Sequence, residues 1–326
     1  MEKNLPSMPS SDTSLIAALV IPCFNEELAL PLSSKRLIDT LGQLVMHHQC
    51  SERSFILFID DGSTDKTWHI IQGLIKNQPN GMMGIRLAAN VGHQAALLCG
   101  LNFAKDRCDF AISIDADLQD DLGVIPEMIA KHREGADLVL GVRQSRGNDS
   151  WFKKTSAMAY YKLAKRLGVN LVEDHADFRL ISRQSLEHLN SFSEVNIFLR
   201  GLVTLLSSST AIVKYHRQDR IAGESKYPFI KMLALSWNGI TSFSTFPLRL
   251  ISLLSLLVFI CTLAMIIYAV VGFFQGAALP GWASTVIPLY FLGGVMLLSL
   301  SIIGEYISKI MVESKRRPRY LIKEVL

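Results

Sequence analysis

A long stretch without charge, from Leu250 to Gly304, constrains the fold of this chain more than any other feature. Within it, Ile251–Phe274 has 24 uncharged residues and Ala283–Gly304 has 22. A helix needs about 20 apolar residues to cross the hydrocarbon core of a bilayer. A pair of buried core helices is the alternative, but two such runs are rare in soluble domains. The sequence therefore predicts a transmembrane hairpin over residues 249–311, with spans at 251–274 and 283–304.

Basic residues flank this hairpin, whereas its connecting loop Gln275–Trp282 carries no charge. The flanking cations are Lys226, Lys231 and Arg249 before the hairpin and Lys309, Lys315, Arg316 and Arg317 after it. Lysine and arginine mark the cytoplasmic side of a membrane. We therefore expect a multi-pass protein of the inner (cytoplasmic) membrane, with both termini and the globular part in the cytosol.

The remaining composition is that of a globular intracellular protein. The formal net charge of +4 is modest and does not indicate a nucleic-acid partner. The five cysteines are scattered and form no C-x-x-C pair, which argues against disulfides and structural zinc. The first apolar run, Leu15–Pro22, is too short for a signal sequence. We expect residues 1–14 to be a flexible tail.

The first half of the chain alternates short apolar runs with amphipathic stretches. This pattern predicts an α/β domain with a mostly parallel sheet and helices on both faces. The predicted strands are Ile16–Ile21, Phe55–Ile59, Gly84–Leu87, Phe110–Ile114, Leu138–Gly141 and Ala211–His216, and the predicted helices include Thr64–Lys76, His93–Lys105, Trp151–Arg166, Gln184–Asn190 and Val195–Leu206. We expect this domain at 15–227, interfacial helices at 228–248 and, after the hairpin, a cytosolic tail at 312–326.

An acidic cluster, Asp115-Ala116-Asp117-Leu118-Gln119-Asp120, follows one predicted strand. In parallel sheets, ligands bind at these carboxyl ends. In an extended backbone, Asp115, Asp117 and Gln119 would point to the same side. Two adjacent carboxylates repel unless a cation sits between them, and Mg²⁺ or Mn²⁺ prefers such oxygen ligands and shares them with phosphates. A surface acidic turn is the alternative, but the position after a buried strand favours a metal site.

Two other strand ends carry polar clusters, Pro22–Glu26 and Asp60–Asp65. A tight turn is the simple structural interpretation of the second cluster. Functionally, Asp60 or Asp61 suits a base imide N–H or ribose hydroxyls, Glu26 suits a ribose, and Phe24 suits the flank of a base.

The sequence has neither a P-loop nor a G-x-G-x-x-G fingerprint, so metal and basic side chains must hold any phosphates. The candidate cations are Arg143, Lys153, Lys154, Arg179, Arg220 and Lys226. For the helix at Trp151–Arg166, a solvated basic face is an equally good interpretation. The segment Arg220–Lys226 suits a nucleotide diphosphate or a lipid phosphate, and contact with anionic headgroups is the alternative.

Two further features leave their roles open. Asp177 and Arg179 lie two positions apart on a predicted extended segment, where they form either a structural ion pair or part of a site. The eight histidines show no metal-ligand spacing. One of them, His93, lies with Gln94 at a strand-to-helix turn near the presumed site.

As an ordered set, these motifs resemble the family-2 glycosyltransferases that load polyprenyl phosphates, including dolichol-phosphate mannose synthases and bactoprenol glucosyltransferases. The matching segments run from Ile16 to Lys226, and the C-terminal hairpin resembles that of the bactoprenol branch. They are Ile21-Pro22-Cys23-Phe24-Asn25-Glu26-Glu27, Asp60-Asp61-Gly62-Ser63-Thr64-Asp65, Asn90-Val91-Gly92-His93-Gln94, Asp115-Ala116-Asp117-Leu118-Gln119-Asp120, Asp177-Phe178-Arg179-Leu180 and Arg220-Ile221-Ala222-Gly223-Glu224-Ser225-Lys226.

This resemblance implies a GT-A fold and inverting transfer from a nucleotide-sugar donor. It implies Mg²⁺ or Mn²⁺ at Asp117 and Gln119, and a place for Asp115 beside the donor. The implied nucleotide contacts are Pro22, Phe24, Glu26, Asp61 and Asp115. The implied phosphate contacts are Arg220, Ser225, Lys226 and, for the acceptor, Arg143, with a looser match at Lys153, Lys154 and Ser156.

The resulting hypothesis is direct displacement at a membrane surface. The lipid phosphate attacks the anomeric carbon, the metal and Arg220 stabilise the leaving group, and Asp177 orients rather than acts as an essential base. The hairpin favours UDP-glucose as donor and undecaprenyl phosphate as acceptor. UDP-galactose, UDP-N-acetyl sugars, a modified arabinose donor and GDP-mannose stay open.

Two rival functions are weaker. A processive polysaccharide synthase would carry a Q-x-x-R-W element, which no tryptophan of this chain has. A catalytically silent membrane scaffold would not need the intact acidic cluster. Finally, the tail Arg316–Ile322 suits an edge strand that pairs with a neighbouring copy, which would give a homo-oligomer.

Overall fold

The computed structural model describes residues 14–79, 81–144, 175–194, 199–207, 209–216, 246–274 and 281–326. The chain divides into two compact units. The globular unit contains the described residues up to 216 together with Pro318–Leu326, and the helical unit contains the described residues between 246 and 317. Each unit is described by itself.

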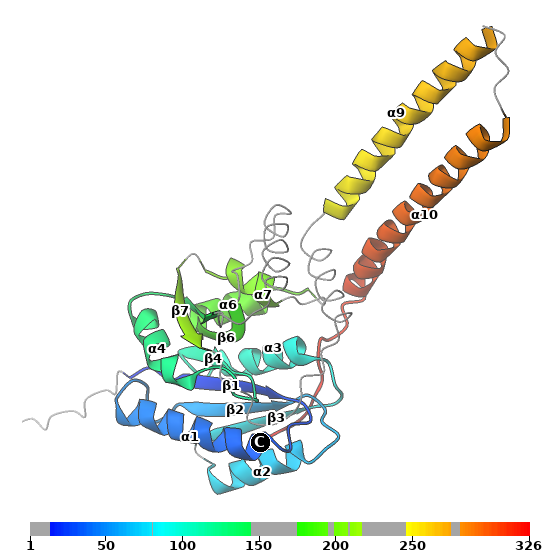
Figure 1. The fold of residues 1–326 in the computed structure, drawn as a ribbon. Coiled ribbons are helices and arrows are strands. Elements are labelled where there is room, and N and C mark those ends of the chain that lie inside the picture. The colour runs from blue at the N-terminus through cyan, green and yellow to red at the C-terminus, as the bar shows by residue number, and fades with distance from the viewer. Residues whose placement is uncertain are drawn as a thin grey trace, which may run out of the picture. The chain divides into compact units, whose positions relative to one another are not determined.

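The globular unit is built on a sheet whose eight strands run in the order β7-β5-β6-β4-β1-β2-β3-β8 (Figure 1). The pairs β1–β2, β1–β4, β2–β3 and β5–β7 are parallel, and β6 and β8 run antiparallel to their neighbours. The strands are β1 (Ala17–Cys23), β2 (Phe55–Asp60), β3 (Met82–Leu87), β4 (Phe110–Ser113), β5 (Leu138–Gln144), β6 (His175–Ser182), β7 (Thr210–His216) and β8 (Ile322–Val325). The predicted mostly parallel sheet is confirmed.

Helices cover both faces of this sheet, which explains why β1 and β2 are continuous apolar runs buried along their whole length. On one face pack α1 (Leu30–Met46), α2 (Thr67–Asn77) and α4 (Ile125–Arg133), the last entered through the 3-10 turn η1 (Leu122–Val124). On the other face pack α3 (His93–Ala104), α6 (Arg183–Ser191) and α7 (Leu199–Leu202). The globular unit thus has the GT-A type of α/β architecture that the resemblance implied.

The described part of the predicted helix Val195–Leu206 is helical over residues 199–205, but it is not one continuous α-helix. A single turn, α7, is followed by the 3-10 turn η2 (Val203–Leu205) and then by a loop. In that loop the Ser207 hydroxyl accepts a hydrogen bond from the Ser209 N–H at 2.9 Å. Serine side chains that bond to nearby backbone in this way compete with helix formation. The predicted segments Trp151–Arg166 and 228–248 lie outside the described residues, apart from 246–248, which begin α9.

The C-terminal residues return to the sheet as its edge strand. Gly84 of β3 and Leu326 exchange backbone hydrogen bonds of 3.0 and 2.9 Å. The Trp68 indole N–H donates to Glu324 at 3.2 Å, and the Asn102 amide donates to the Tyr320 hydroxyl at 3.0 Å. An edge strand was expected at Arg316–Ile322, but the strand lies at Ile322–Val325, and its partner in this structure is β3 of the same chain rather than a neighbouring copy.

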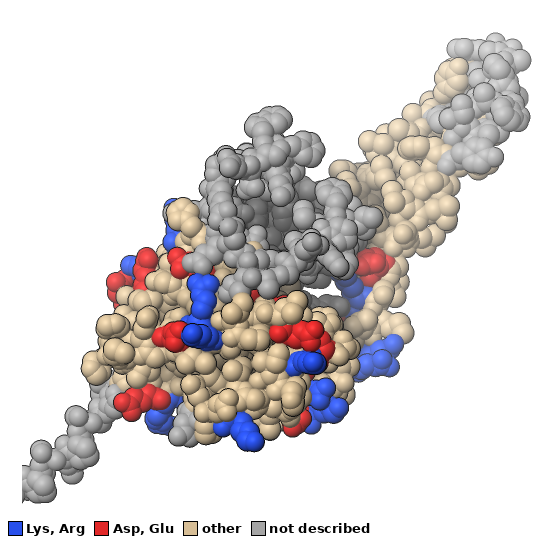
Figure 2. Space-filling model, turned by 60° about the horizontal axis from the view of Figure 1, so that its bottom comes forward, with Lys and Arg blue, Asp and Glu red and all other residues tan. Residues whose placement is uncertain are grey.

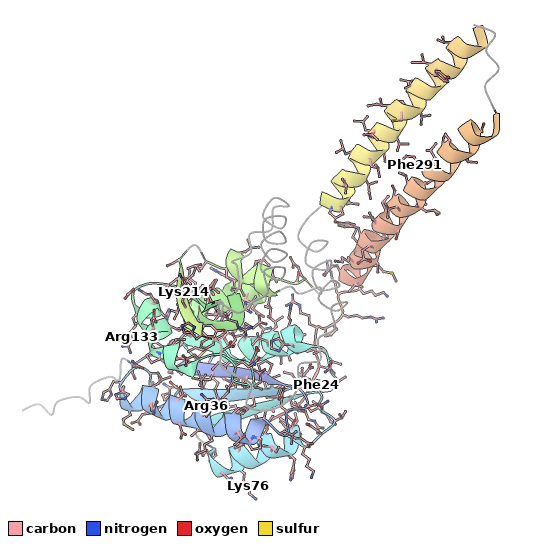
Figure 3. All side chains as sticks on the ribbon, viewed as in Figure 1. Phe24, Arg36, Lys76, Arg133, Lys214 and Phe291 are labelled. Carbon is pink, nitrogen blue, oxygen red and sulfur yellow. The ribbon has the colours of Figure 1, made fainter. Side chains whose placement is uncertain are left out.

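The helical unit consists of α9 (Phe246–Phe274) and α10 (Gly281–Ser314), both longer than the predicted spans. Within α10, Phe291–Ser314 is long and apolar enough to cross a membrane, and Leu250–Ala264 of α9 is a shorter apolar stretch. Large apolar side chains such as Phe259 and Leu297 are 65% and 70% exposed. The described atoms of the helical unit that face the viewer in Figure 2 are mostly tan, which marks residues other than Lys, Arg, Asp and Glu, and Phe291 projects from α10 in Figure 3. Exposed apolar surface on this scale marks a contact with lipid or protein.

Candidate active site

The loops after β1 and β2 are joined by hydrogen bonds at the carboxyl end of the sheet. The Ser63 hydroxyl accepts from the Asn25 N–H at 2.9 Å, and Thr67 accepts from the Glu26 N–H at 2.8 Å. In return, the Thr64 N–H donates to the Asn25 side chain at 2.9 Å. Asn25 has a φ of 55°, a conformation that asparagine tolerates better than most residues. The two loops therefore act as one wall.

Predicted nucleotide contacts lie on this wall. Phe24 is 44% exposed and projects from the end of β1, at the opposite end of the globular unit from Arg133 (Figure 3). Pro22 is the buried penultimate residue of β1, and Glu26 is half-buried. Beside them is a hollow of about 360 Å³, lined by Asn25, Glu26, Glu27, Leu28, Ala29, Thr64 and Asp65. The hollow is lined by residues of these loops and not by the acidic cluster.

Asp60 and Asp61 end β2 and have different partners. Asp60 is fully buried, accepts from the Ser63 N–H at 3.2 Å and lies 3.5 Å from Arg86. Asp61 accepts from the backbone N–H groups of Val91 at 2.8 Å and Gly92 at 3.0 Å. Burial raises the pKa of Asp61, although these two N–H groups oppose the shift. Asp61 therefore fastens the loop between β3 and α3.

The acidic cluster after β4 forms a turn, so the expected extended geometry is wrong. The Leu118 N–H donates to the Asp115 carbonyl at 3.1 Å, and Leu118 has a φ of 45°. Ala116 is 4% and Leu118 0% exposed, so both side chains of this turn lie in the core. Asp115 and Asp117 remain half-buried, whereas Gln119 is 9% exposed.

Asp115 and Asp177 face one histidine that the sequence did not single out as a site residue. The Nε2 atom of His93 lies 3.6 Å from Asp115 Oδ1 and 3.6 Å from Asp177 Oδ2. Burial raises the pKa of Asp115 to about 6, helped by the charges of Asp120, Asp177 and Asp117 and opposed by His93. Burial lowers the pKa of His93, but hydrogen bonding to Asp177 and the nearby Asp115 charge outweigh it, so that the pKa is raised overall. The available signal was the place of His93 at the start of a helix beside the site.

Asp177 reaches this cluster because β6 pairs antiparallel with β4, with Ser113 opposite Arg179. The Ser113 hydroxyl donates to the Asp177 carbonyl, and the Arg179 guanidinium donates to the Asp177 carboxylate. Arg179 is only 1% exposed. The structural ion pair expected for these two residues is confirmed, and the phosphate role of Arg179 stays a prediction.

A second buried cluster lies at the other end of the acidic motif. Asp120 is 1% exposed and accepts from Arg143 at 3.0 Å and from the Tyr215 hydroxyl. Arg143 also donates to the Tyr215 oxygen at 3.1 Å. Burial and the Asp120 charge raise the pKa of Tyr215, and the pKa of Arg143 is raised because Asp120 and Tyr215 outweigh burial. Asp120 and Tyr215 were missed as site residues, and only the motif position of Asp120 pointed to it.

In the described structure, Asp115 and Asp177 thus both lie near His93, and Arg143 forms an ion pair with Asp120. Six predicted site residues lie outside the described part of the chain: Lys153, Lys154, Ser156, Arg220, Ser225 and Lys226. Their roles stay predictions.

The donor set can be compared with what a divalent cation requires. In the part of the chain that the structure describes, no group of three or more His, Cys, Asp or Glu side chains is arranged to hold a metal. Mg²⁺ and similar ions often use one or two carboxylates and take their other ligands from water and substrate phosphates. Burial is the main cause of the raised pKa of Asp115, and the charges of Asp120, Asp177 and Asp117 add to it, so a cation nearby would favour the ionised carboxylate. The roles of Asp117 and Gln119 as ligands of a metal shared with a diphosphate stay a prediction.

The sequence from residue 18 to 189 matches the family described as glycosyl transferase family 2. The chain belongs to this family. The match includes the loops after β1 and β2, the acidic turn and Asp177.

Similar proteins match the chain nearly end to end. The Bacillus subtilis protein called uncharacterized glycosyltransferase YkoT is 46% identical over 94% of this chain and 91% of its own. The Escherichia coli prophage bactoprenol glucosyl transferase homolog is 37% identical over 94% and 98%. The bactoprenol glucosyl transferase of Shigella phage SfV is 38% identical over 94% and 97%. These alignments therefore extend beyond the globular unit.

Among solved structures, a glucosyl-3-phosphoglycerate synthase from Mycobacterium tuberculosis matches 73% of this chain and 83% of its own. Its TM-score is 0.44 and its identity 17%, a likeness too distant to inform the site.

Proposed function

We propose that this enzyme transfers glucose from UDP-glucose, with inversion, to a polyprenyl phosphate such as undecaprenyl phosphate, at the cytoplasmic face of the inner membrane. The observation that carries the proposal is the meeting of Asp115, Asp177 and His93 beside the loops of β1 and β2. Support for the acceptor comes from relatives named bactoprenol glucosyl transferases, which align over 94% of this chain.

In this proposal the donor nucleotide lies on the wall of joined loops. Pro22, Phe24, Glu26 and Asp61 contact the nucleoside, and Asp115 lies beside the donor. A divalent cation held by Asp117 and Gln119 would neutralise charge on the departing diphosphate. Arg220, Ser225 and Lys226 are proposed to bind the same phosphates.

The acceptor phosphate oxygen attacks the anomeric carbon, and the bond from that carbon to the nucleoside diphosphate breaks. The second pKa of a phosphate monoester is ~6, so the nucleophile is largely ionised at neutral pH and needs no protein base. Asp177 suits an orienting role, because one carboxylate oxygen is paired with Arg179 and the other faces His93. Arg143 is proposed to bind the acceptor phosphate, with its guanidinium fixed by Asp120 and Tyr215.

The topology of the chain supports a two-span anchor. The globular unit contains residues on both sides of the helical unit, since β8 belongs to the same sheet as β1. The chain must therefore cross a membrane an even number of times between residues 216 and 318. If α10 crosses, one further crossing is required, and α9 is the described helix that can supply it. Both termini would then lie on the cytosolic side with the active site.

The proposal is tested by transfer of radiolabelled sugar to undecaprenyl phosphate by the full chain in detergent or vesicles. The donors are UDP-glucose, UDP-galactose, UDP-N-acetylglucosamine, a modified arabinose donor and GDP-mannose, each with Mg²⁺ or Mn²⁺. We expect UDP-glucose to be preferred and a glucosyl lipid to be found by mass analysis. Asp117→Ala should abolish transfer, and activity that survives it would exclude the metal assignment. A wild-type chain that binds donor but never labels lipid would exclude the acceptor, and one that does neither would favour a silent scaffold.

A further inference from the structure

We propose that His93 is a positioning residue of the active site, which holds the carboxylates of Asp115 and Asp177 in place and is itself held by a loop that Asp61 fastens. The inference rests on the proposed function, because it names the residue that arranges the two acids beside the sugar. Positioning residues act through other groups, so the expected effect is on turnover and not on the binding of nucleotide.

The geometry places one ring nitrogen between two acids from different strands. His93 Nε2 is 3.6 Å from Asp115 Oδ1, at the end of β4, and 3.6 Å from Asp177 Oδ2, on β6. Two carboxylates brought together without a cation would repel each other. Protein hydrogen bonds at catalytic sites are often long before substrate binds and tighten in the complex. The His93 N–H is therefore in a position to set the separation of the two acids.

The charged groups around His93 act in opposite directions. The charges of Asp115, Asp177 and Asp61 favour the protonated imidazole. The positive charge of Arg179, which pairs with Asp177, disfavours it. Because Arg179 holds the other Asp177 oxygen, the Asp177 carboxylate is fixed on both sides. His93 completes this arrangement from the start of α3, so the three side chains come from three different parts of the fold.

Contacts on two sides hold the loop that precedes His93. Both oxygens of Asp61 accept N–H groups of the two residues that precede His93. Gly62, at φ 65°, lies so close to this loop that a Cβ would stand 2.6 Å from the Ala89 carbonyl carbon and the Asn90 nitrogen. On the other side, the Ala88 N–H donates to the Leu321 carbonyl of the C-terminal segment at 2.8 Å.

The helix after His93 is also fixed, since the Gln94 side chain accepts from the Leu199 N–H at 3.2 Å. His93 itself contributes little to the core, because its side chain is 43% exposed. The side chain of His93 is thus placed by contacts of the residues on both sides of it rather than by burial in the core.

The kinetic test compares His93→Phe and His93→Gln with the wild type in transfer of glucose to undecaprenyl phosphate. Phenylalanine keeps the ring without its N–H, and glutamine keeps one N–H donor. We expect His93→Phe to lower kcat about 10- to 100-fold, as displacements of about 1 Å at an active site do, with the KM for UDP-glucose changed less than about 3-fold. His93→Gln should recover part of the loss. The control His69→Gln, on an exposed residue of α2, should leave the kinetics unchanged.

Full activity of His93→Phe would overturn the proposal, and so would a loss that appears only in KM. A readout independent of activity is the ring ¹⁵N signal of His93 in histidine-labelled full chain, assigned with His93→Gln. Both Asp115→Asn and Asp177→Asn should shift this signal, and no shift with either would also overturn the proposal. If the wild type transfers no sugar, the proposed function fails, while the NMR result still decides whether His93 bridges the two acids.

Discussion

Asp115 and Asp120 lie five positions apart on one turn, yet their surroundings differ in kind. Asp120 is almost fully buried and has an arginine and a tyrosine as partners. Asp115 keeps a third of its side chain exposed, and its nearest cation is a histidine that it shares with Asp177. Three other acids raise its pKa. The charge of Asp120 is compensated by Arg143, whereas the charge of Asp115 has no arginine or lysine partner among the described residues.

The different surroundings of the two carboxylates indicate that, within one motif, Asp120 serves stability and Asp115 serves function. A buried charge with good partners contributes to a unique local structure and is costly to disturb. Acids that destabilise one another persist where a ligand relieves the repulsion, and such strained sites are typical of function. We therefore expect substitutions at the two aspartates to have opposite effects on stability and different effects on transfer.

The largest effect is expected for Asp115→Asn, which keeps the shape of the side chain and removes its charge. Transfer of sugar to lipid should fall by about 10²- to 10³-fold, the usual cost of losing one preorganised group at a reacting centre. The melting temperature of the globular unit at pH 7.5 should stay equal or rise, because repulsion within the cluster is reduced. Calorimetry and the radiolabel assay on the same preparation measure both. A lower melting temperature would show that Asp115 is compensated after all.

The next largest effect is expected for Asp120→Asn, which leaves the Arg143 guanidinium without its counter-charge. Breaking a buried ion pair on one side costs about 3 kcal/mol or somewhat more. At about 2–4 °C per kcal/mol for a domain of this size, the melting temperature should drop by roughly 6–12 °C.

Tyr215→Phe is the matched control for that substitution, because it removes the hydrogen bonds of the hydroxyl with Asp120 and Arg143 and leaves the ion pair between these two residues. No buried charge loses its counter-charge, so the loss of stability should be smaller. Equal losses in the two variants would mean that the ion pair adds nothing beyond the tyrosine contact.

Much of this arrangement is legible in the sequence, because apolar runs that end in polar clusters predict a parallel sheet and its ligand-binding edge. The acidic motif was found in this way, and the extended segment at Asp177 was expected from the spacing of Asp177 and Arg179. The contrast between Asp115 and Asp120 was not, because it depends on pairings between residues far apart in sequence. Tyr215 reaches Asp120 only because β5 and β7 lie side by side, and Asp177 reaches Asp115 only because β6 runs antiparallel to β4.

The turn at Ala116 shows a different limit. Alternation along an extended strand predicted that Asp115, Asp117 and Gln119 share one side. The chain forms a turn here instead, closed by the bond from the Leu118 N–H to the Asp115 carbonyl, with Leu118 at a positive φ. Short-range periodicity holds only while the strand continues, and β4 ends at Ser113.

A moderate effect is expected from added metal, which should depend on Asp117 and not on Asp120. Mn²⁺ with UDP at about 100 times the dissociation constant would stabilise the folded state by roughly 2.7 kcal/mol. The wild type and Asp120→Asn should both gain melting temperature on addition of Mn²⁺ and UDP, whereas Asp117→Asn should gain much less. An equal gain in Asp117→Asn would place the metal elsewhere.

The smallest effect is expected in the pH dependence of stability, and its sign follows from the raised pKa of Asp115, about 6 against an ordinary 3.8. Between these two values the folded protein binds more protons at this site than the unfolded chain does. Stability contributed by Asp115 therefore falls as the pH rises through this window and is constant above it. Asp115→Asn lacks this term, so the melting temperature of the variant minus that of the wild type should increase from pH 4 to pH 6 and then level off.

The same comparison made with Asp120→Asn tests whether the pattern belongs to Asp115. That variant should show a smaller increase across the window, because the Asp120 charge supplies only part of the shift in the pKa of Asp115, whereas Asp115→Asn removes the titrating group itself. The raised pKa of His93 acts at higher pH, since its stabilising charge is lost as the pH rises above the ordinary value of 6.5. A difference between Asp115→Asn and the wild type that stays flat from pH 4 to pH 6 would contradict the view that Asp115 is held at an electrostatic cost for the sake of its ligand.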